Sequence, residues 1–203
     1  MLFLGDIGLA SFALASGKPL WTAGDAAPGA PRCLQPILLG DGRVFAATMG
    51  AMNAGLAQVA KNGEAWKVES RWSSTKVKAE FSEYVAYKDH AYGFDGAILC
   101  CVDLANGDRK WKGGRYGRGQ LVLFEEQGVL LVLTEKGEVA LVAAKPDRHE
   151  ELYKFPAIEG KTWNHPVVAG GELFLRNAEE MGRWTLPREN GAAAPERRKG
   201  KKQ

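Results

Sequence analysis

The chain has 203 residues, of which 45% are hydrophobic and 25 are glycine, and its formal net charge is only +3. This length and apolar content suffice for a folded core, and the small net charge, with no basic stripe in the body, argues against a nucleic-acid-binding protein. Basic residues are concentrated from Arg188 onward, where the sequence is rich in Gly, Ala and Pro and has no apolar period. We therefore expect a disordered basic tail over 188–203.

The chain opens with short apolar segments that could be mistaken for a signal peptide. Asp6 interrupts these segments, and no Lys or Arg precedes Lys18. A secretory signal requires a basic start, so these residues are predicted to be the second and third strands of a repeat unit. No later run is long and apolar enough to predict a transmembrane helix.

The clearest repeat unit lies in the middle of the chain. Asp95-Gly96 and Asn106-Gly107 are hairpin turn signals between runs of β-forming residues, and Trp111 opens the strand that follows. This order of strands and tight turns predicts an antiparallel β-meander.

Tryptophans mark the period of the repeat. Trp21, Trp66 and Trp111 each follow a Gly-containing turn at intervals of about 45 residues, a length typical of a propeller blade. Their common phase predicts that all three pack between neighbouring blades. In a degraded fourth copy Tyr153-Lys154-Phe155 replaces the tryptophan, and a fifth copy begins at Pro166.

The period divides residues 1–187 into blades. The expected bounds are 1–31 (partial), 32–74, 75–119, 120–163 and 164–187 (partial). The predicted fold is therefore an all-β propeller of four-stranded antiparallel blades, with four to five blades present in an incomplete or open ring. An open arc leaves sheet edges unpaired, which favours association or completion by a protein partner.

The order of strand, Asp-Gly turn, strand ending in Asp-Leu, Asn-Gly turn and Trp is similar to the repeat of the pyrroloquinoline-quinone (PQQ) enzyme-like β-propellers. That family includes quinoprotein alcohol dehydrogenases, and also propellers without cofactor, such as the lipoprotein that helps to assemble bacterial outer-membrane proteins. The resemblance implies a location in the bacterial periplasm or cell envelope. Because fold does not determine activity, two functions stay open. One is a non-catalytic scaffold for a protein or a small ligand in the channel, and the other is a fragment of a PQQ-dependent alcohol or sugar dehydrogenase.

Four residues in predicted inter-blade loops are candidates for contact with a ligand. Arg115 and Arg118 lie in a Gly-rich basic run at the junction of two blades, where the loops of PQQ dehydrogenases approach the cofactor. The run lacks the ending of a P-loop, which disfavours a phosphate site. Trp163 and Asn164 lie in a segment that resembles the last blade of bacterial PQQ-like propellers, and they could serve a quinone site.

The cysteines and histidines do not predict an active site. Cys100-Cys101 resembles the vicinal disulfide of quinoprotein alcohol dehydrogenases, but neighbouring residues on a strand point to opposite faces. We expect buried free thiols, aligned with Leu141 and Val142 of the next repeat. Cys33 and the three histidines complete no metal or nucleophile motif. No catalytic residue, metal site or cofactor is therefore expected, and PQQ with Ca²⁺ belongs only to the dehydrogenase alternative.

Overall fold

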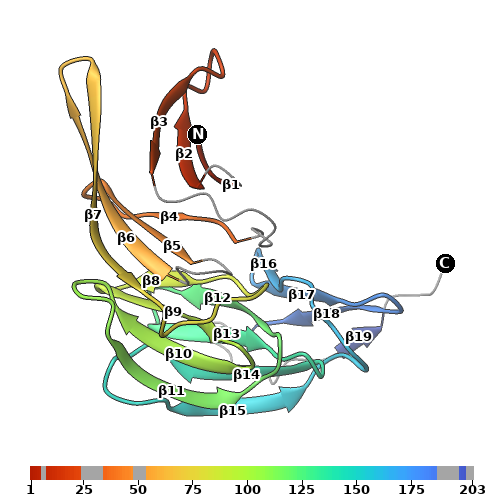
Figure 1. Ribbon diagram of the computed structural model, residues 1–203. Helices are drawn as coiled ribbons and strands as arrows, with labels where there is room; N and C mark the ends of the chain where they lie inside the picture. Colours follow the sequence, from red (N-terminus) through yellow and green to blue (C-terminus); the bar gives the residue numbers. More distant parts are fainter. Residues whose placement is uncertain (6–7, 24–33, 48–53, 187–196, 200–203) are drawn as a thin grey trace.

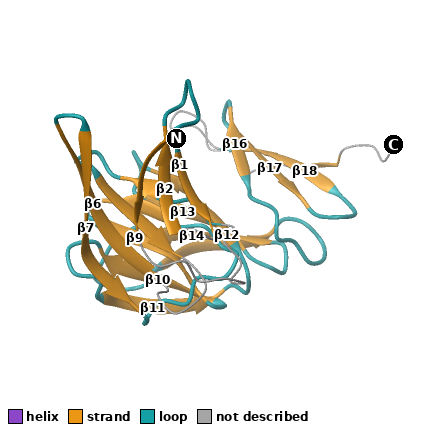
Figure 2. Ribbon diagram, turned by 45° about the horizontal axis from the view of Figure 1, so that its top comes forward, coloured by secondary structure: helices purple, strands orange, loops and turns teal. Residues whose placement is uncertain are grey.

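The computed structural model describes residues 1–5, 8–23, 34–47, 54–186 and the backbone of 197–199. Within these ranges the regular secondary structure consists of strands, which form five antiparallel sheets (Figure 1). Figure 2 shows the same strands joined by loops without an intervening helix, so the described part of the chain holds no helix able to cross a membrane. The prediction of an all-β, open propeller is confirmed.

In every sheet the strands pair in chain order. The first sheet contains β1 (Leu2–Gly5), β2 (Gly8–Phe12) and β3 (Pro19–Ala23). The second contains β4 (Ile37–Leu38), β5 (Arg43–Ala47), β6 (Ala54–Asn62) and β7 (Ala65–Ser74). The third contains β8 (Val85–Tyr87), β9 (His90–Asp95), β10 (Ile98–Asp103) and β11 (Arg109–Arg115). The fourth contains β12 (Gln120–Phe124), β13 (Val129–Leu133), β14 (Glu138–Ala143) and β15 (Glu151–Pro156). The fifth contains β16 (Val167–Ala169), β17 (Glu172–Arg176), β18 (Met181–Thr185) and β19 (Arg197–Lys199).

The strand β19 lies inside the predicted tail. Its backbone pairs with β18, and the rest of 188–203 lies outside the described residues. Among the described residues no strand is shared between two sheets, so no strand closes the arc into a ring.

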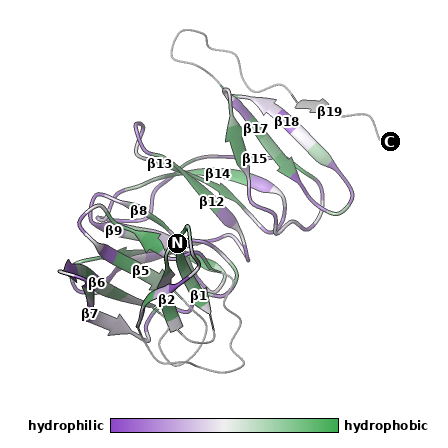
Figure 3. Cartoon of the chain, turned by 90° about the horizontal axis from the view of Figure 1, so that it is seen from above, coloured by the Kyte–Doolittle hydropathy of each residue, from purple (hydrophilic) through white to green (hydrophobic). Residues whose placement is uncertain are grey.

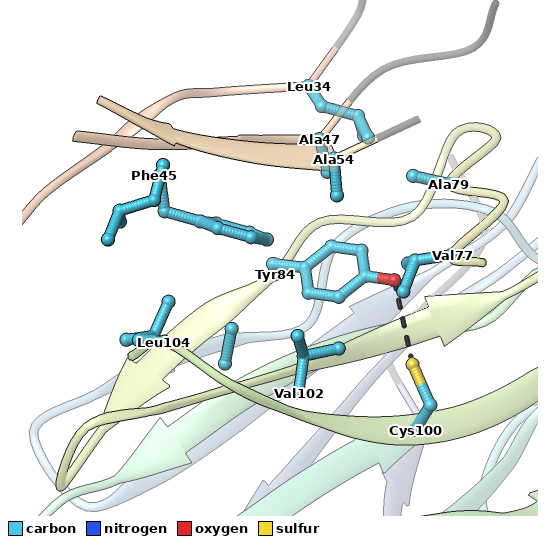
Figure 4. Packing of buried hydrophobic residues seen from close by; sticks show 12 residues of the cluster. Leu34, Phe45, Ala47, Ala54, Val77, Ala79, Tyr84, Cys100, Val102 and Leu104 are labelled. Carbon is cyan, nitrogen blue, oxygen red and sulfur yellow. Dashed lines mark hydrogen bonds between the residues drawn. The ribbon is translucent and has the colours of Figure 1, made fainter. Parts of the chain in front are cut away.

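Apolar side chains pack between each sheet and the next. Alternation along the strands sends one set of side chains to the preceding sheet and the other set to the following sheet. Phe45 of β5 thus meets Tyr84 and Val102 of the third sheet (Figure 4), whereas Phe94 of β9 meets Leu130 of the fourth. Figure 3 shows hydrophobic stretches along β14 and β17, which face each other in the next interface.

Cys100 and Cys101 show this alternation directly. Both are fully buried free thiols, and burial raises the pKa of each to about 12. Cys100 packs between the second and third sheets, where its Sγ lies 3.6 Å from Tyr84 Oη (Figure 4). Cys101 packs between the third and fourth sheets. The prediction of buried free thiols is confirmed.

A register shift recurs between the third and fourth strands of the first four sheets. It follows Ser11, Leu56, Cys101 and Leu141. The residues opposite these four are Trp21, Trp72, Trp111 and Tyr153. The shift therefore aligns Cys101 with Leu141, one residue away from the alignment made by sequence, and identifies Trp72 as the counterpart of Trp111.

The prediction that Trp66 packs between blades is wrong. Trp72 takes that place, because its Nε1 donates to Leu104 O of the next sheet (2.8 Å), as Trp111 Nε1 donates to Lys145 O (2.8 Å). The Asn-Gly turn makes this docking possible, since a Cβ on Gly107 (φ +78°) would lie 2.5 Å from the Trp72 ring.

Trp66 lies instead on a projecting hairpin, formed by the ends of β6 and β7 over 59–68. The neighbouring strand β5 pairs with β6 only as far as Gln58, whereas β6 and β7 continue to pair as far as Asn62 and Ala65. The extra length carries Trp66, 36% exposed, away from the sheet (Figure 1, upper left). Residues inserted into one hairpin thus displaced the tryptophan from the common phase.

Candidate functional site

Three connections of the same kind lead from the last strand of one sheet to the first strand of the next. They are 75–84, 116–119 and 157–166. Because the strands of every sheet alternate in direction and follow the same order, these connections lie on one side of the arc. The turn 134–137, which joins the second and third strands of the fourth sheet, lies on that side too. We call the surface made by these four segments the loop face.

Glu135 joins two of the predicted site residues at the loop face. Its Oε1 accepts a hydrogen bond from Trp163 Nε1 (2.9 Å), and its Oε2 accepts one from Arg118 N (3.2 Å). The bond from Trp163 is the largest cause that keeps the pKa of Glu135 below its ordinary value, while burial acts in the opposite direction. The main chain of Glu135 is also fixed, by Tyr116 O (2.8 Å) and Thr162 N (3.0 Å). The indole of Trp163 is therefore anchored to a carboxylate that is itself held in place.

Gln120 ties together three connections from beneath. This buried residue is the first of β12, and its Nε2 donates to Phe81 O (3.1 Å) and to Trp163 O (3.4 Å). Its Oε1 accepts a hydrogen bond from Glu83 N (3.2 Å). The Glu83 carboxylate in turn accepts a bond from Gln35 N (3.0 Å), although burial has the larger effect and raises the pKa of Glu83. A buried amide with both ends bonded in this way fixes the backbone on either side of it.

Above this framework the loop face presents two aromatic rings and two cations. Phe81 is 48% exposed and Trp163 is 53% exposed. Arg118 Nε forms an ion pair with Glu80 Oε2 (2.7 Å). Lys161 Nζ lies 3.9 Å from the centre of a Trp163 ring and 3.8 Å from Glu135 Oε1.

The other two predicted site residues are not part of this group. Arg115 is exposed at the end of β11, and within the described residues no hydrogen bond or ion pair joins it to Arg118, Trp163 or Asn164. Asn164 is turned toward the fifth sheet. With its amide oxygen facing the guanidinium, it accepts from Arg176 Nη2 (3.1 Å) and donates to Arg176 O (3.3 Å).

The residues present do not fit a quinone site with Ca²⁺. Such a site needs carboxylate and amide oxygens gathered around one ion. The Asn164 amide faces Arg176, and the oxygens of Glu135 accept bonds from Trp163 and Arg118. Across the described ranges, no group of three or more His, Cys, Asp or Glu residues could hold a metal ion.

Two further polar groups stabilise the fold away from the loop-face rings. Asp95, 6% exposed, accepts hydrogen bonds from Arg109 Nη1 (2.8 Å), Lys112 Nζ (2.6 Å) and Lys78 N (3.0 Å). Burial alone would raise the pKa of Asp95, but the bonds from Lys112 and Lys78 and the nearby charges outweigh it and lower the pKa.

The second group joins the outer strands of the third and fourth sheets. Tyr116 Oη donates to Glu151 Oε2 (2.8 Å) and lies 2.9 Å from His149 Nε2. Burial lowers the pKa of His149, and the Glu151 charge opposes that effect. The His149 ring packs edge-on against Trp111, so this group locks the loop 144–150 to the preceding sheet.

Sequence reasoning identified Trp163 and Arg118 but missed Glu135, Gln120 and Phe81. One signal was available, because Gln120 precedes the apolar run Leu121-Val122-Leu123 and an amide at the head of a buried strand needs hydrogen-bond partners. The partners themselves are 37 to 43 residues away in sequence, so only the fold reveals them.

Comparison with known proteins agrees with the fold. No protein-family model matches the chain, and no curated protein matches it in sequence. Among solved structures it is similar to the computationally designed Ika8 protein (TM-score 0.67, 9% identity, 89% of this chain and 53% of that one). It is also similar to BamB from Moraxella catarrhalis, a β-propeller (TM-score 0.50, 10% identity, 76% and 58%). A third similar chain belongs to the mitotic checkpoint complex (TM-score 0.52, 11% identity, 88% and 68%). The chain thus spans little more than half the length of the first two.

Proposed function

We propose that the chain is a non-catalytic β-propeller scaffold that binds a segment of another protein at the loop face. One observation carries the proposal: the buried Gln120 side chain holds the backbone of both Phe81 and Trp163, whose side chains are half exposed. Aromatic residues that are fixed before binding lose little entropy on complex formation and often dominate the energy of an interface. Longer connections on a rigid β-framework are also where propellers and other scaffolds place their binding residues.

The structural similarities support the same proposal. One similar chain comes from the mitotic checkpoint complex, which its name describes as an assembly. A bacterial periplasmic or cell-envelope location, implied by the resemblance to PQQ-like propellers, belongs to this proposal, and the similarity to BamB supports it.

Selection from a displayed library of random peptides tests the proposal. Clones that bind the immobilised chain are compared on Phe81→Ala, Trp163→Ala and Trp66→Ala variants. We expect the clones to lose binding to the first two variants and to keep it on Trp66→Ala, which removes an exposed tryptophan from the projecting hairpin. Thermal unfolding checks that the variants are folded. If no clone is selected, or if the clones bind all three variants equally, the proposal is wrong.

A further inference from the structure

The chemistry of the loop face also indicates the kind of segment that binds there, an inference that rests on the proposed function. We infer that the segment is acidic and carries an apolar or aromatic side chain beside its carboxylates. The arrangement of charge around Phe81 and Trp163 supports this partner.

The cations of the loop face are its outer layer, and their carboxylate partners are its inner layer. The Arg118 side chain is 46% exposed against 30% for Glu80, and the Lys161 side chain is 61% exposed against 25% for Glu135. An approaching chain meets the outer layer first, so the two ion pairs present positive charge although their sum is neutral. Charge complementarity of this kind selects partners and speeds encounter.

Lys161 is held weakly enough to exchange partners. Its Nζ is 3.8 Å from Glu135 Oε1, at the outer limit of an ion pair, and it lies over the Trp163 ring at 3.9 Å. Exposed contacts of both kinds contribute little to stability. A carboxylate on the partner can therefore draw Lys161 off the ring, which uncovers the indole for an apolar side chain while Glu135 continues to hold Nε1.

Arg118 gives the inference its sharpest consequence. Its guanidinium pairs with Glu80, whereas its backbone N donates to Glu135, so changing the side chain leaves the anchor of the loop intact. A ligand carboxylate at Arg118 must compete with Glu80. Removing the Arg118 charge should therefore weaken an acidic ligand, and removing the Glu80 charge should strengthen it.

Matched synthetic peptides test the inference by fluorescence anisotropy. The acidic probe is fluorescein-labelled Gly-Asp-Glu-Phe-Asp-Glu-Leu-Asp-Gly, and its control is the amide analogue Gly-Asn-Gln-Phe-Asn-Gln-Leu-Asn-Gly. We expect the acidic peptide to bind more tightly than its analogue and to weaken as salt is raised. Arg118→Gln should weaken its binding about two- to fivefold and Glu80→Gln should tighten it by a similar factor, since exposed charge pairs have this range. Trp163→Ala should abolish binding.

The outcomes separate this inference from the proposed function. If the amide analogue binds as tightly as the acidic peptide, or if Arg118→Gln and Glu80→Gln shift affinity in the same direction, the acidic partner is wrong. The scaffold proposal still holds in that case when Trp163→Ala abolishes binding. If the acidic peptide fails to bind and Trp163-dependent display clones carry no excess of Asp or Glu, the inference again falls alone. Peptide binding that survives Trp163→Ala, with display clones that do not need Trp163, would remove both.

Discussion

At the scale of single residues, Asp95 illustrates how a turn signal in the sequence can conceal a structural carboxylate. Asp95-Gly96 is recognisable as a hairpin turn, and β9 and β10 are indeed joined there. The side chain, however, is buried and binds two cations and the main chain of the connection 75–84. The same carboxylate therefore fastens one of the loop-face connections to the third sheet.

Asp95→Asn should lower the free energy of unfolding at pH 7 by about 2 kcal/mol, because it leaves Arg109 and Lys112 without their counter-charge. The folded-state pKa lies below the ordinary value of 3.8, so the contribution of Asp95 is present above that pH and is lost as the pH falls through the folded pKa. Urea unfolding at several pH values measures both effects. Asp89→Asn is the control, since the exposed Asp89 carboxylate pairs with Arg43 at the surface, and little change is expected there. A gap between Asp95→Asn and the original chain that persists below pH 3 would contradict the assignment.

At the scale of strands, the four register shifts show how each sheet is fastened to the next. The residue opposite the shift is a tryptophan in three sheets, and two of these rings donate to a main-chain oxygen of the following sheet. In the fourth sheet the position holds Tyr153, which is exposed. Docking between sheets thus depends on this one position more than on the period of the tryptophans in the sequence.

Trp111→Ala should cost about 3 kcal/mol or more in urea unfolding, because it removes a buried ring and leaves Lys145 O without its donor. Trp66→Ala should cost much less, since the ring lies on the projecting hairpin. Similar losses for the two variants would show that Trp66 packs between sheets after all. Because both variants remove the same side chain, the comparison isolates position from residue type.

The sequence predicted the architecture well and the site only in part, for physical reasons. Tight turns and β-forming runs are local, so they revealed the meander and the open propeller. The phase of Trp66 failed because extra residues in one hairpin do not alter the pairing of the sheet. At the loop face, an exposed Trp163 and a basic Arg118 are visible as residue types, whereas Glu135 and Gln120 act through partners in other sheets.

At the scale of the whole molecule, β1 presents an edge that is covered in the other sheets. Met1 and Phe12 exchange both main-chain hydrogen bonds (2.7 and 2.8 Å). Alternation along an antiparallel pair then directs the backbone groups of Leu2 and Leu4 away from β2. In the other four sheets a first strand pairs along this edge, but within the described residues nothing pairs with β1 there.

We expect the chain to associate in a concentration-dependent manner, and Phe3→Lys to reduce that association, because a charge on an open edge strand opposes pairing. Light scattering coupled to size-exclusion chromatography measures both. Leu14→Lys provides the control, since Leu14 is even more exposed than Phe3 but lies in the turn after β2. A chain that stays monomeric at all concentrations, or equal effects of the two substitutions, would contradict a role for β1.

The neighbouring thiols of β10 give the arc two internal reporters at consecutive positions. Cys100 is sealed between the second and third sheets and Cys101 between the third and fourth, and neither reacts readily while burial keeps it protonated. Alkylation of one thiol therefore records the parting of one pair of sheets, and alkylation of the other records the parting of the next pair. The order in which the two are modified reads out whether the arc opens blade by blade or as a single unit.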